Sequence, residues 1–143
     1  MQVKTALFGH VDISNNNIFE MPQGPLGFDE HCRYALLERE DQGVIFRWFQ
    51  ATDNESLCFV VFDPNEIITG YSPEPETRDL EQLGCKHPND LRYFAIAVIP
   101  EDYMQATINL KSPIAVNPVT RIAKQVILQN VDYPIRFPLA FEA

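Results

Sequence analysis

A chain of 143 residues is the length of one domain and can bury on the order of 68% of the surface that its unfolded form exposes. Hydrophobic residues make up 45% of the chain and charged residues 22%, both close to globular averages, which argues against wholesale disorder. The formal net charge of −9, without a Lys/Arg cluster, argues against nucleic-acid binding and against an anionic membrane surface, because both attract cations.

The acidic residues are unevenly distributed. Residues 53–82 carry eight acids and one base, whereas residues 101–143 carry four of each. Such a segment suits a basic protein partner, because opposite fields speed and orient encounter. The plainer interpretation is that the charge only keeps the domain soluble.

Cysteine usage and the N-terminus indicate a cytoplasmic location. The three cysteines are widely spaced and form no C-x-x-C pair, a pattern more typical of a reducing compartment than of a disulfide-bonded secreted domain. The first residues have no sustained apolar core of the kind a signal peptide needs. The longest apolar run, Tyr93–Ile99, is too short to span a bilayer as a helix.

Short β-rich segments follow one another along the chain. Eleven scattered prolines leave little room for long helices. Gly9 marks a bend between the first two segments, three asparagines mark a turn before the third, and Asp41-Gln42-Gly43 forms a hairpin loop. The predicted strands are Val3–Phe8, Val11–Ile13, Ile18–Met21, Val44–Ala51, Leu57–Phe62, Tyr93–Ile99, 106–111, Ile114–Asn117 and Gln125–Leu128.

Two segments have helical features. Residues 77–84 combine Thr77 as an N-cap, early acids, two leucines on one face and a glycine stop, which predicts a two-turn helix packed on the sheet. Residues 29–40 show a partial helical stripe but lead straight into the hairpin loop, so we expect a turn followed by a strand there. The predicted fold is all-β: a single small antiparallel β-barrel-like domain over residues 1–143, with one short helix at about 77–84.

No catalytic, cofactor or metal site is predicted. His31 beside Cys32 is the nearest approach to a metal pair, but neighbouring strand residues point to opposite faces, so a buried cysteine beside a surface histidine is the preferred interpretation. Cys58 lies in an apolar run, which is unsuited to a reactive thiolate. Residues 24–27 read as a tight loop with two positive-φ glycines, not as a phosphate cradle.

Polar side chains interrupt the segment 107–117. Strict alternation over 106–111 places Thr107 and Asn109 on a wet face, and Pro113 indicates an edge or a bulge. Asn117 precedes a proline, which favours extended or turn geometry. These amides either satisfy turn backbone or form a surface for protein recognition by hydrogen bonding or strand addition.

Four motifs in order resemble the FliW family of flagellar assembly factors. Thr107 through Leu128 resembles the family's T-x-N-L-x-x-P-I-x-x-N … G-x-Q-x-V-L signature. The other motifs are Phe19–Phe28, Phe49–Pro64 and Asp132–Leu139, which resemble F-x-x-G-[IL]-P-G-F, L-Q-S … L-x-F-x-V-x-D-P and D-Y-P-x-x-x-P-L. Two departures are Pro25-Leu26, with the proline one place early, and Ala123 where glycine is usual.

The resemblance implies a β-barrel-like fold without catalysis or cofactor, and a cytoplasmic switch. Proteins of this family bind newly made flagellin and antagonise CsrA, an RNA-binding translational repressor. Flagellin that has not been exported holds the factor, so that CsrA represses flagellin translation; export releases the factor to bind CsrA. An acidic chain is consistent with a repressor that is basic where RNA docks.

The hypothesis is therefore a protein-binding regulator with partners flagellin and CsrA. An enzyme or cofactor-binding small barrel is the alternative, and a nucleic-acid-binding barrel with Phe46, Trp48 and Phe49 stacking on bases is a weaker one. The predicted partner-binding residues come from the acidic segment and the amide-rich edge: Asp53, Asn54, Asp63, Tyr71, Glu74, Glu76, Asp79, Glu81, Asn109, Pro113, Asn117, Lys124 and Gln125.

Overall fold

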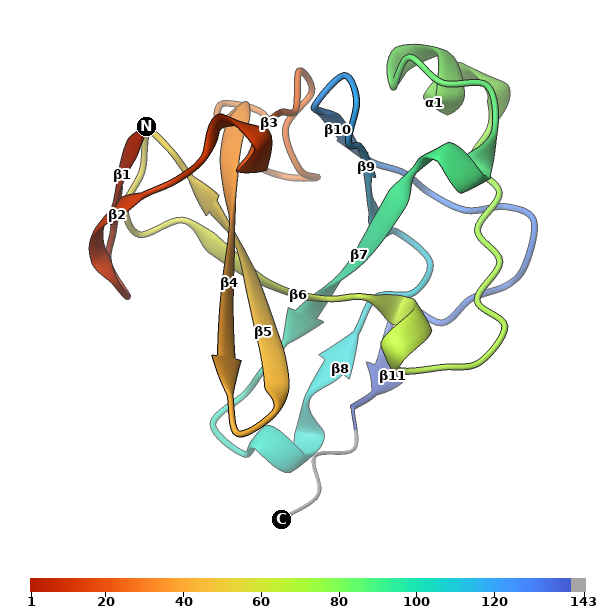
Figure 1. The fold of residues 1–143 in the computed structure, drawn as a ribbon. Coiled ribbons are helices and arrows are strands. Elements are labelled where there is room, and N and C mark those ends of the chain that lie inside the picture. Colours follow the sequence, from red (N-terminus) through yellow and green to blue (C-terminus); the bar gives the residue numbers. More distant parts are fainter. Residues whose placement is uncertain (140–143) are drawn as a thin grey trace.

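The computed structural model describes residues 1–139, most of them in short strands joined by turns. The strands are β1 (Gln2–Thr5), β2 (Gly9–Asp12), β3 (Ile18–Glu20), β4 (Arg33–Asp41), β5 (Val44–Ala51), β6 (Cys58–Phe62), β7 (Arg92–Val98), β8 (Thr107–Ile108), β9 (Ile114–Asn117), β10 (Ile122–Gln125) and β11 (Phe137–Pro138). The helices are α1 (Thr77–Gln82) and the 3-10 turns η1 (Asn15–Asn17), η2 (Pro64–Glu66), η3 (Pro88–Asp90) and η4 (Tyr103–Gln105). Figure 1 shows the strands arranged around one centre, with α1 at the side of β9 and β10.

Seven strands close into a barrel. The hydrogen-bonded order runs β7-β6-β5-β4-β3-β10-β9, and β9 pairs back onto the first half of β7. All these pairings are antiparallel except the contact of β10 with β3, which is parallel. The second half of β7 pairs instead with β8, which carries β11, and β1 and β2 form a separate hairpin. The all-β barrel with one short α-helix that the sequence predicts is confirmed.

The β4–β5 hairpin is the longest regular element, and its turn is the one predicted. Asp41 pairs with Val44, so that Gln42 and Gly43 form a two-residue loop. Both have positive φ, 52° and 82°, as a hairpin turn that matches the right-handed strand twist requires. The turn-then-strand interpretation of residues 29–40 is likewise confirmed, because β4 begins at Arg33.

Aromatic packing fills the barrel interior. Phe49 is fully buried and meets Phe19 and Phe94 edge-to-face, with ring centroids 6.1 Å and 5.6 Å away. These rings belong to one buried cluster that draws on all seven barrel strands, β3, β4, β5, β6, β7, β9 and β10. Edge-to-face pairs add about 0.5–1.5 kcal/mol each to the burial of apolar area. The barrel is therefore a packed core, and Phe49 is a core residue rather than a base-stacking one.

A second buried cluster lies outside the barrel and carries α1. Leu83, just beyond α1, is fully buried in it, together with Tyr71, Leu110 and Leu128. The two turns of α1 could not persist alone. Packing of this cluster against β7, β8 and β9 therefore holds the helix at the side of the barrel, the position that it has in Figure 1.

Several predicted boundaries are wrong by a few residues. The N-cap of α1 is Glu76 and not Thr77, because Glu76 and Asp79 form a reciprocal capping box. The strand predicted at 125–128 is β10, which lies three residues earlier; residues 126–128 continue as extended chain bonded to Pro113 and Lys111. The first predicted strand stops at Thr5, whose hydroxyl accepts from the N–H of Phe8 and donates to Gly9.

Both departures from the family pattern fit the backbone. Ala123 lies inside β10 opposite Val116 and needs no positive φ; Arg121 in the preceding turn takes it instead, at 59°. In the Pro25-Leu26 loop the two glycines have positive φ, 62° at Gly24 and 86° at Gly27. A side chain at Gly24 would collide with the carbonyl oxygen of Phe28, so that position requires glycine.

Candidate functional site

The predicted acidic segment does not form one surface. Asp53 lies in the loop between β5 and β6, on the opposite side of the barrel from α1 in Figure 1. Asp63 caps η2, where its carboxylate accepts the N–H of Asn65 at 2.9 Å. Glu74, Glu76 and Glu81 lie before and along α1 and are exposed. The acids therefore fall into at least two separate groups.

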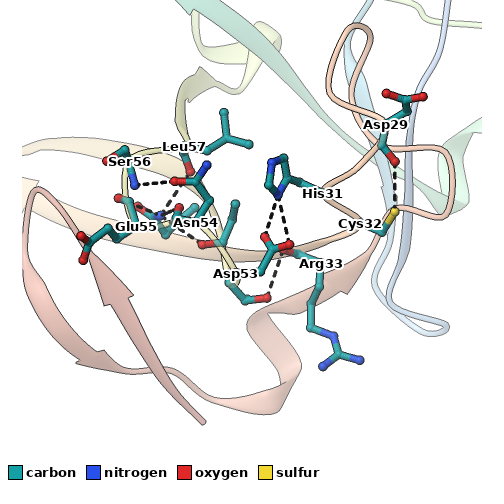
Figure 2. A network of polar contacts seen from close by, with 12 residues as sticks. Asp29, His31, Cys32, Arg33, Asp53, Asn54, Glu55, Ser56 and Leu57 are labelled. Atoms are coloured by element: carbon teal, nitrogen blue, oxygen red, sulfur yellow. Dashed lines mark hydrogen bonds and ion pairs between the residues drawn. The ribbon is translucent and has the colours of Figure 1, made fainter.

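The loop that carries Asp53 is held by internal contacts, which Figure 2 shows. Nδ1 of His31 lies 3.0 Å from each carboxylate oxygen of Asp53, so His31 is paired and not simply a solvated histidine. Asn54 accepts the N–H of Ser56 at 3.0 Å. Beneath the loop, the fully buried side-chain amide of Gln50 faces the carbonyls of Ala51, Asn54, Glu55 and Leu57 at 3.0–3.3 Å.

Asp79 is part of the core and not of an acidic exterior. Its residue exposure is 5%, and Oδ1 lies 2.6 Å from Nζ of Lys124 on β10. Oδ2 accepts the N–H of Glu76 at 3.1 Å, and the Lys124 ammonium also donates to Gln82. Lys124 thereby ties both turns of α1 to the barrel wall. Asp79 and Lys124 are among the partner-binding residues predicted from the sequence, but their polar groups form bonds within the molecule.

The segment before α1 is attached to the last extended stretch of the chain. The side-chain amide of Asn130 accepts the N–H of Glu74 at 3.2 Å and donates to the carbonyl of Ser72 at 2.9 Å. Tyr71 is buried, and its hydroxyl donates to the carbonyl of Leu110 at 2.7 Å. Glu74 and Glu76 therefore stand on a braced segment and are exposed, although the Glu76 carboxylate also accepts the backbone N–H of Asp79 in the capping box of α1.

The amide-rich edge mostly satisfies backbone groups. Asn109 accepts the N–H groups of Lys111 and Ser112 at 3.1 Å and 2.9 Å. Gln125 accepts from the N–H of Leu26 at 2.8 Å and donates to the carbonyl of Ser112 at 3.0 Å, so it ties the 22–28 loop to the barrel. Pro113 is buried, and its carbonyl accepts from Val126.

Asn117 connects the β9–β10 turn to the end of α1. It is 4% exposed; Nδ2 donates to the carbonyl of Leu83 at 2.7 Å, and Oδ1 accepts from Val119 at 3.0 Å. The carbonyl of Leu83 has no partner within the helix, and Asn117 is the nearer of its two donors, since the Thr120 hydroxyl lies 3.3 Å away. Of the two interpretations left open for this residue, satisfaction of turn backbone is the one that its contacts support.

Replacement of Asn117 by alanine should lower the free energy of unfolding by about 2 kcal/mol, because the N–H of Val119 loses its acceptor and the carbonyl of Leu83 keeps only the longer bond from Thr120. The measurement is urea unfolding followed by circular dichroism. Asn65→Ala is the matched control, since Asn65 is exposed and its side-chain amide contacts only Asp63, at 3.3 Å. A loss at Asn117 no greater than that of the control would contradict this assignment.

Two of the three cysteine thiols have raised pKa values. Burial raises the pKa of the Cys58 thiol to about 11, and burial, with Asp90 second, raises the pKa of Cys85. Among residues 1–139, no three His, Cys, Asp or Glu side chains gather so that they could hold a metal ion. Within the same residues, no helix is long and apolar enough to cross a membrane.

Sequence reasoning missed the apolar residues of the surface around the 22–28 loop, although the hollows there are also lined by predicted partner-binding residues: Glu76, Asp79, Asn109, Lys124 and Gln125. Three hollows lie along it, and large apolar side chains at their rims are exposed: Leu26 (57%), Val98 (65%), Ile127 (44%) and Ile135 (58%). Each comes from a different element, so no run or periodicity in the sequence marks them as one patch. The alternation of residues 106–111 also indicated this surface, since it places Thr107 and Asn109 there.

The arrangement defines a class of protein: a closed small β-barrel with a braced helix at its side, whose polar side chains mostly serve the fold. The FliW protein family model matches residues 2–139. Relatives named flagellar assembly factor FliW include those of Natranaerobius thermophilus, 35% identical over 97% of this chain and 92% of the relative, and of Syntrophus aciditrophicus, 36% identical over 97% and 87%. A crystal structure of the flagellar assembly factor FliW superposes with a TM-score of 0.85 at 28% identity, covering 99% of each chain.

This chain therefore belongs to the FliW family, as the four ordered motifs indicated.

Proposed function

We propose that this protein is a cytoplasmic, non-enzymatic flagellar assembly factor that binds flagellin and a CsrA-type translational repressor in alternation. The observation that carries the proposal is full-length similarity to proteins named flagellar assembly factor, in sequence and in fold. Partner switching relieves repression: when flagellin is exported, the factor is free to occupy CsrA. Binding in alternation requires only that the two partners use mutually exclusive contacts, or that binding of one weakens binding of the other by a coupling free energy of about 1–3 kcal/mol.

The exposed acids beside α1 are the part of the predicted interface that the contacts leave available. Glu74, Glu76 and Glu81 are exposed, and no ion pair engages them among the described residues. Asp79 is excluded, because Lys124 neutralises it. A basic surface on the repressor would meet uncompensated negative charge here, which chiefly accelerates association.

The direct test is to mix the purified protein with flagellin and with CsrA, separately and then together, and to resolve the complexes by size-exclusion chromatography. The proposal expects one binary complex with each partner, and displacement of CsrA as flagellin is added. Absence of both binary complexes would refute it. A bound chromophore or catalysed turnover in the purified protein would favour the alternative, a small β-barrel enzyme or cofactor-binding protein.

Reversal of the three acids to lysine should weaken CsrA binding at least about 10-fold and reduce its salt dependence, because the steering field is lost. The matched control reverses Glu40, Asp41 and Glu101, which are also exposed but lie away from α1. Equal effects of the two triple variants would show that only net charge matters. Unchanged binding in the first would remove the acids beside α1 from the interface.

A further inference from the structure

The outer edge of β10 lies beside another strand at its first residue only. β3 pairs with β10 at a single position, where Glu20 lies opposite Ile122. β3 does not continue along β10, because Met21 donates its N–H to the residue just before β4 and Pro22 has no N–H to donate. The chain then turns at Gly24, whose φ is 62°. Beyond Ile122, the edge of β10 is therefore not covered by β3.

Backbone groups along this edge point outward. After β10 the chain stays extended, and the N–H groups of Val126 and Leu128 donate to carbonyls of the segment between β8 and β9, at 3.0 Å and 2.9 Å. Successive residues of an extended chain direct their backbone groups to opposite edges, so those of Gln125 and Ile127 face away from β9. In the described part of the chain, neither the N–H nor the carbonyl of these two residues has a hydrogen-bond partner. We call residues 123–127 the β10 edge.

The β10 edge lies in a groove between the 22–28 loop and α1. A hollow of about 160 Å³ is lined by Gln23 of the loop, by Ala123 and by Gln82 of α1. A hollow of about 250 Å³ is lined by Gln23, by Ile127 and by Arg78 of α1. Figure 1 shows the same arrangement, with β10 between the loop that follows β3 and α1. Both hollows fall below the ~300 Å³ at which small-molecule pockets begin, and they suit single side chains of a bound polypeptide.

The two walls of the groove differ in charge. Residues 22–28 carry no charged side chain. Residues 74–82 carry the three exposed acids beside α1 against one exposed base, Arg78, while their fourth acid, Asp79, is neutralised by Lys124. The α1 wall is therefore net negative even with Arg78 included. It is also continuous with the surface that we propose to meet a basic partner.

We propose that the β10 edge binds an extended segment of a basic protein partner, which joins the barrel as a further strand. The outward N–H and carbonyl groups of Gln125 and Ile127 would bond the backbone of that segment, and its lysine or arginine side chains would face the α1 wall. The inference rests on the proposed function, because it gives the basic partner a mode of attachment. The sequence left strand addition open at residues 107–117, whereas the structure offers it on β10.

The first measurement needs no partner. Amide hydrogen exchange followed by NMR should show Gln125 and Ile127 exchanging at least about 10-fold faster than Val126 and Leu128, whose N–H groups are bonded. Equal protection of the two pairs would show that the edge is already covered, and would overturn the inference.

The second measurement uses capped hexapeptides of alternating lysine and valine. N-methylation of every valine blocks one edge of the peptide, so that it cannot stack on itself and keeps the other edge free. This peptide should shift the amide resonances of Gln125 and Ile127 and slow their exchange. The same peptide methylated at every amide, and a counterpart with glutamate in place of lysine, should each bind at least about 10-fold more weakly.

Ile127→Pro removes one outward N–H and leaves the bonds toward β9 in place, because proline is tolerated where the N–H of an edge strand faces solvent. It should weaken binding of the lysine peptide at least about 10-fold. Ile127→Ala is the matched control, since it keeps the N–H and should retain most of the affinity. The fully methylated peptide tests the same bonds on the parent protein, whether or not the proline variant folds.

Three results would overturn the inference: no binding of the lysine peptide, equal binding of the fully methylated peptide, or equal binding by the proline and alanine variants. Protection of Gln125 and Ile127 that rises with protein concentration would overturn it too, because a second copy of this chain would then occupy the edge. The peptides do not depend on flagellin or CsrA, so a failure at the β10 edge and a failure of the proposed function are distinguishable.

Discussion

The protein should lose most of its stability between pH 9 and pH 12, well before strong alkali attacks the chain. Burial raises the pKa of the Cys58 thiol from 9.0 to about 11. Burial is also the main cause of raised pKa values at the phenols of Tyr34, Tyr71 and Tyr93, whose ordinary value is 10.0. All three tyrosines are less than 9% exposed.

A raised folded-state pKa fixes the sign of the effect. Below the unfolded pKa both states are protonated and the contribution to stability is complete. Above it the unfolded state releases its proton while the folded state cannot, so stability falls as pH rises toward the folded pKa. Each buried phenol lowers the free energy of unfolding by about 1.4 kcal/mol per pH unit above 10. The three together therefore lower it by about 4 kcal/mol at about pH 11. Cys58 adds to this from pH 9, and typical total stability is only about 5–15 kcal/mol.

Urea unfolding at a series of pH values measures the loss, and the part of the tyrosinate absorbance that comes from Tyr34, Tyr71 and Tyr93 should rise together with unfolding and not before it. Tyr34→Phe isolates one contribution, because the buried Tyr34 hydroxyl has no hydrogen-bond partner among the described residues. The free energy of unfolding of the variant, relative to that of the parent protein, should be about 1.4 kcal/mol higher at pH 11 than at pH 8. Tyr103→Phe, at a residue 52% exposed, should follow the parent curve. An unaltered pH dependence in Tyr34→Phe would contradict this account.

Most of the fold could be predicted from the sequence because its signals are local. The hairpin loop at Gln42-Gly43 depends on two backbone conformations that a short polar-glycine pair adopts easily. The apolar runs over β6 and β7 are also local signals, and they predict strands that are buried on both faces. Closure of the barrel does not follow from such signals. It depends on the parallel contact of β10 with β3 and on β9 returning to β7, both between segments distant in sequence.

The site was harder to predict, because sequence shows which residues are charged but not which charges are already used. Asp79 and Glu76 look equivalent in the printed chain, yet Asp79 is buried against a lysine 45 residues further on and Glu76 faces solvent. The exposed apolar side chains around the 22–28 loop illustrate the converse case. Val98 and Ile135 look like core residues in their own segments, and only the assembled fold leaves them exposed.

Replacement of Lys124 by methionine should be among the most damaging single changes in the protein, with a loss of about 3–5 kcal/mol. Methionine preserves the length of the apolar stem, so the loss reports the charge. The side chains of Asp79 and Lys124 are only 7% and 14% exposed, and removal of the ammonium leaves a buried carboxylate without its counter-ion. Lys4→Met is the matched control. Lys4 is 64% exposed and its partner Glu55 is 46% exposed, so this ion pair contributes less than about 1 kcal/mol to the free energy of unfolding.

The double variant Asp79→Leu, Lys124→Met separates the buried charge from the packing around it. Because no carboxylate is left unpaired, it should recover about 2 kcal/mol of the loss. Recovery stays incomplete, since Asp79 also caps α1 through the N–H of Glu76. Hydrogen exchange should show the Lys124→Met loss first in the amides of α1, which the ammonium joins to β10 through Asp79 and Gln82. A double variant less stable than Lys124→Met would show that the pair holds the helix by direct attraction, and that the buried, unpaired carboxylate is not the source of the damage.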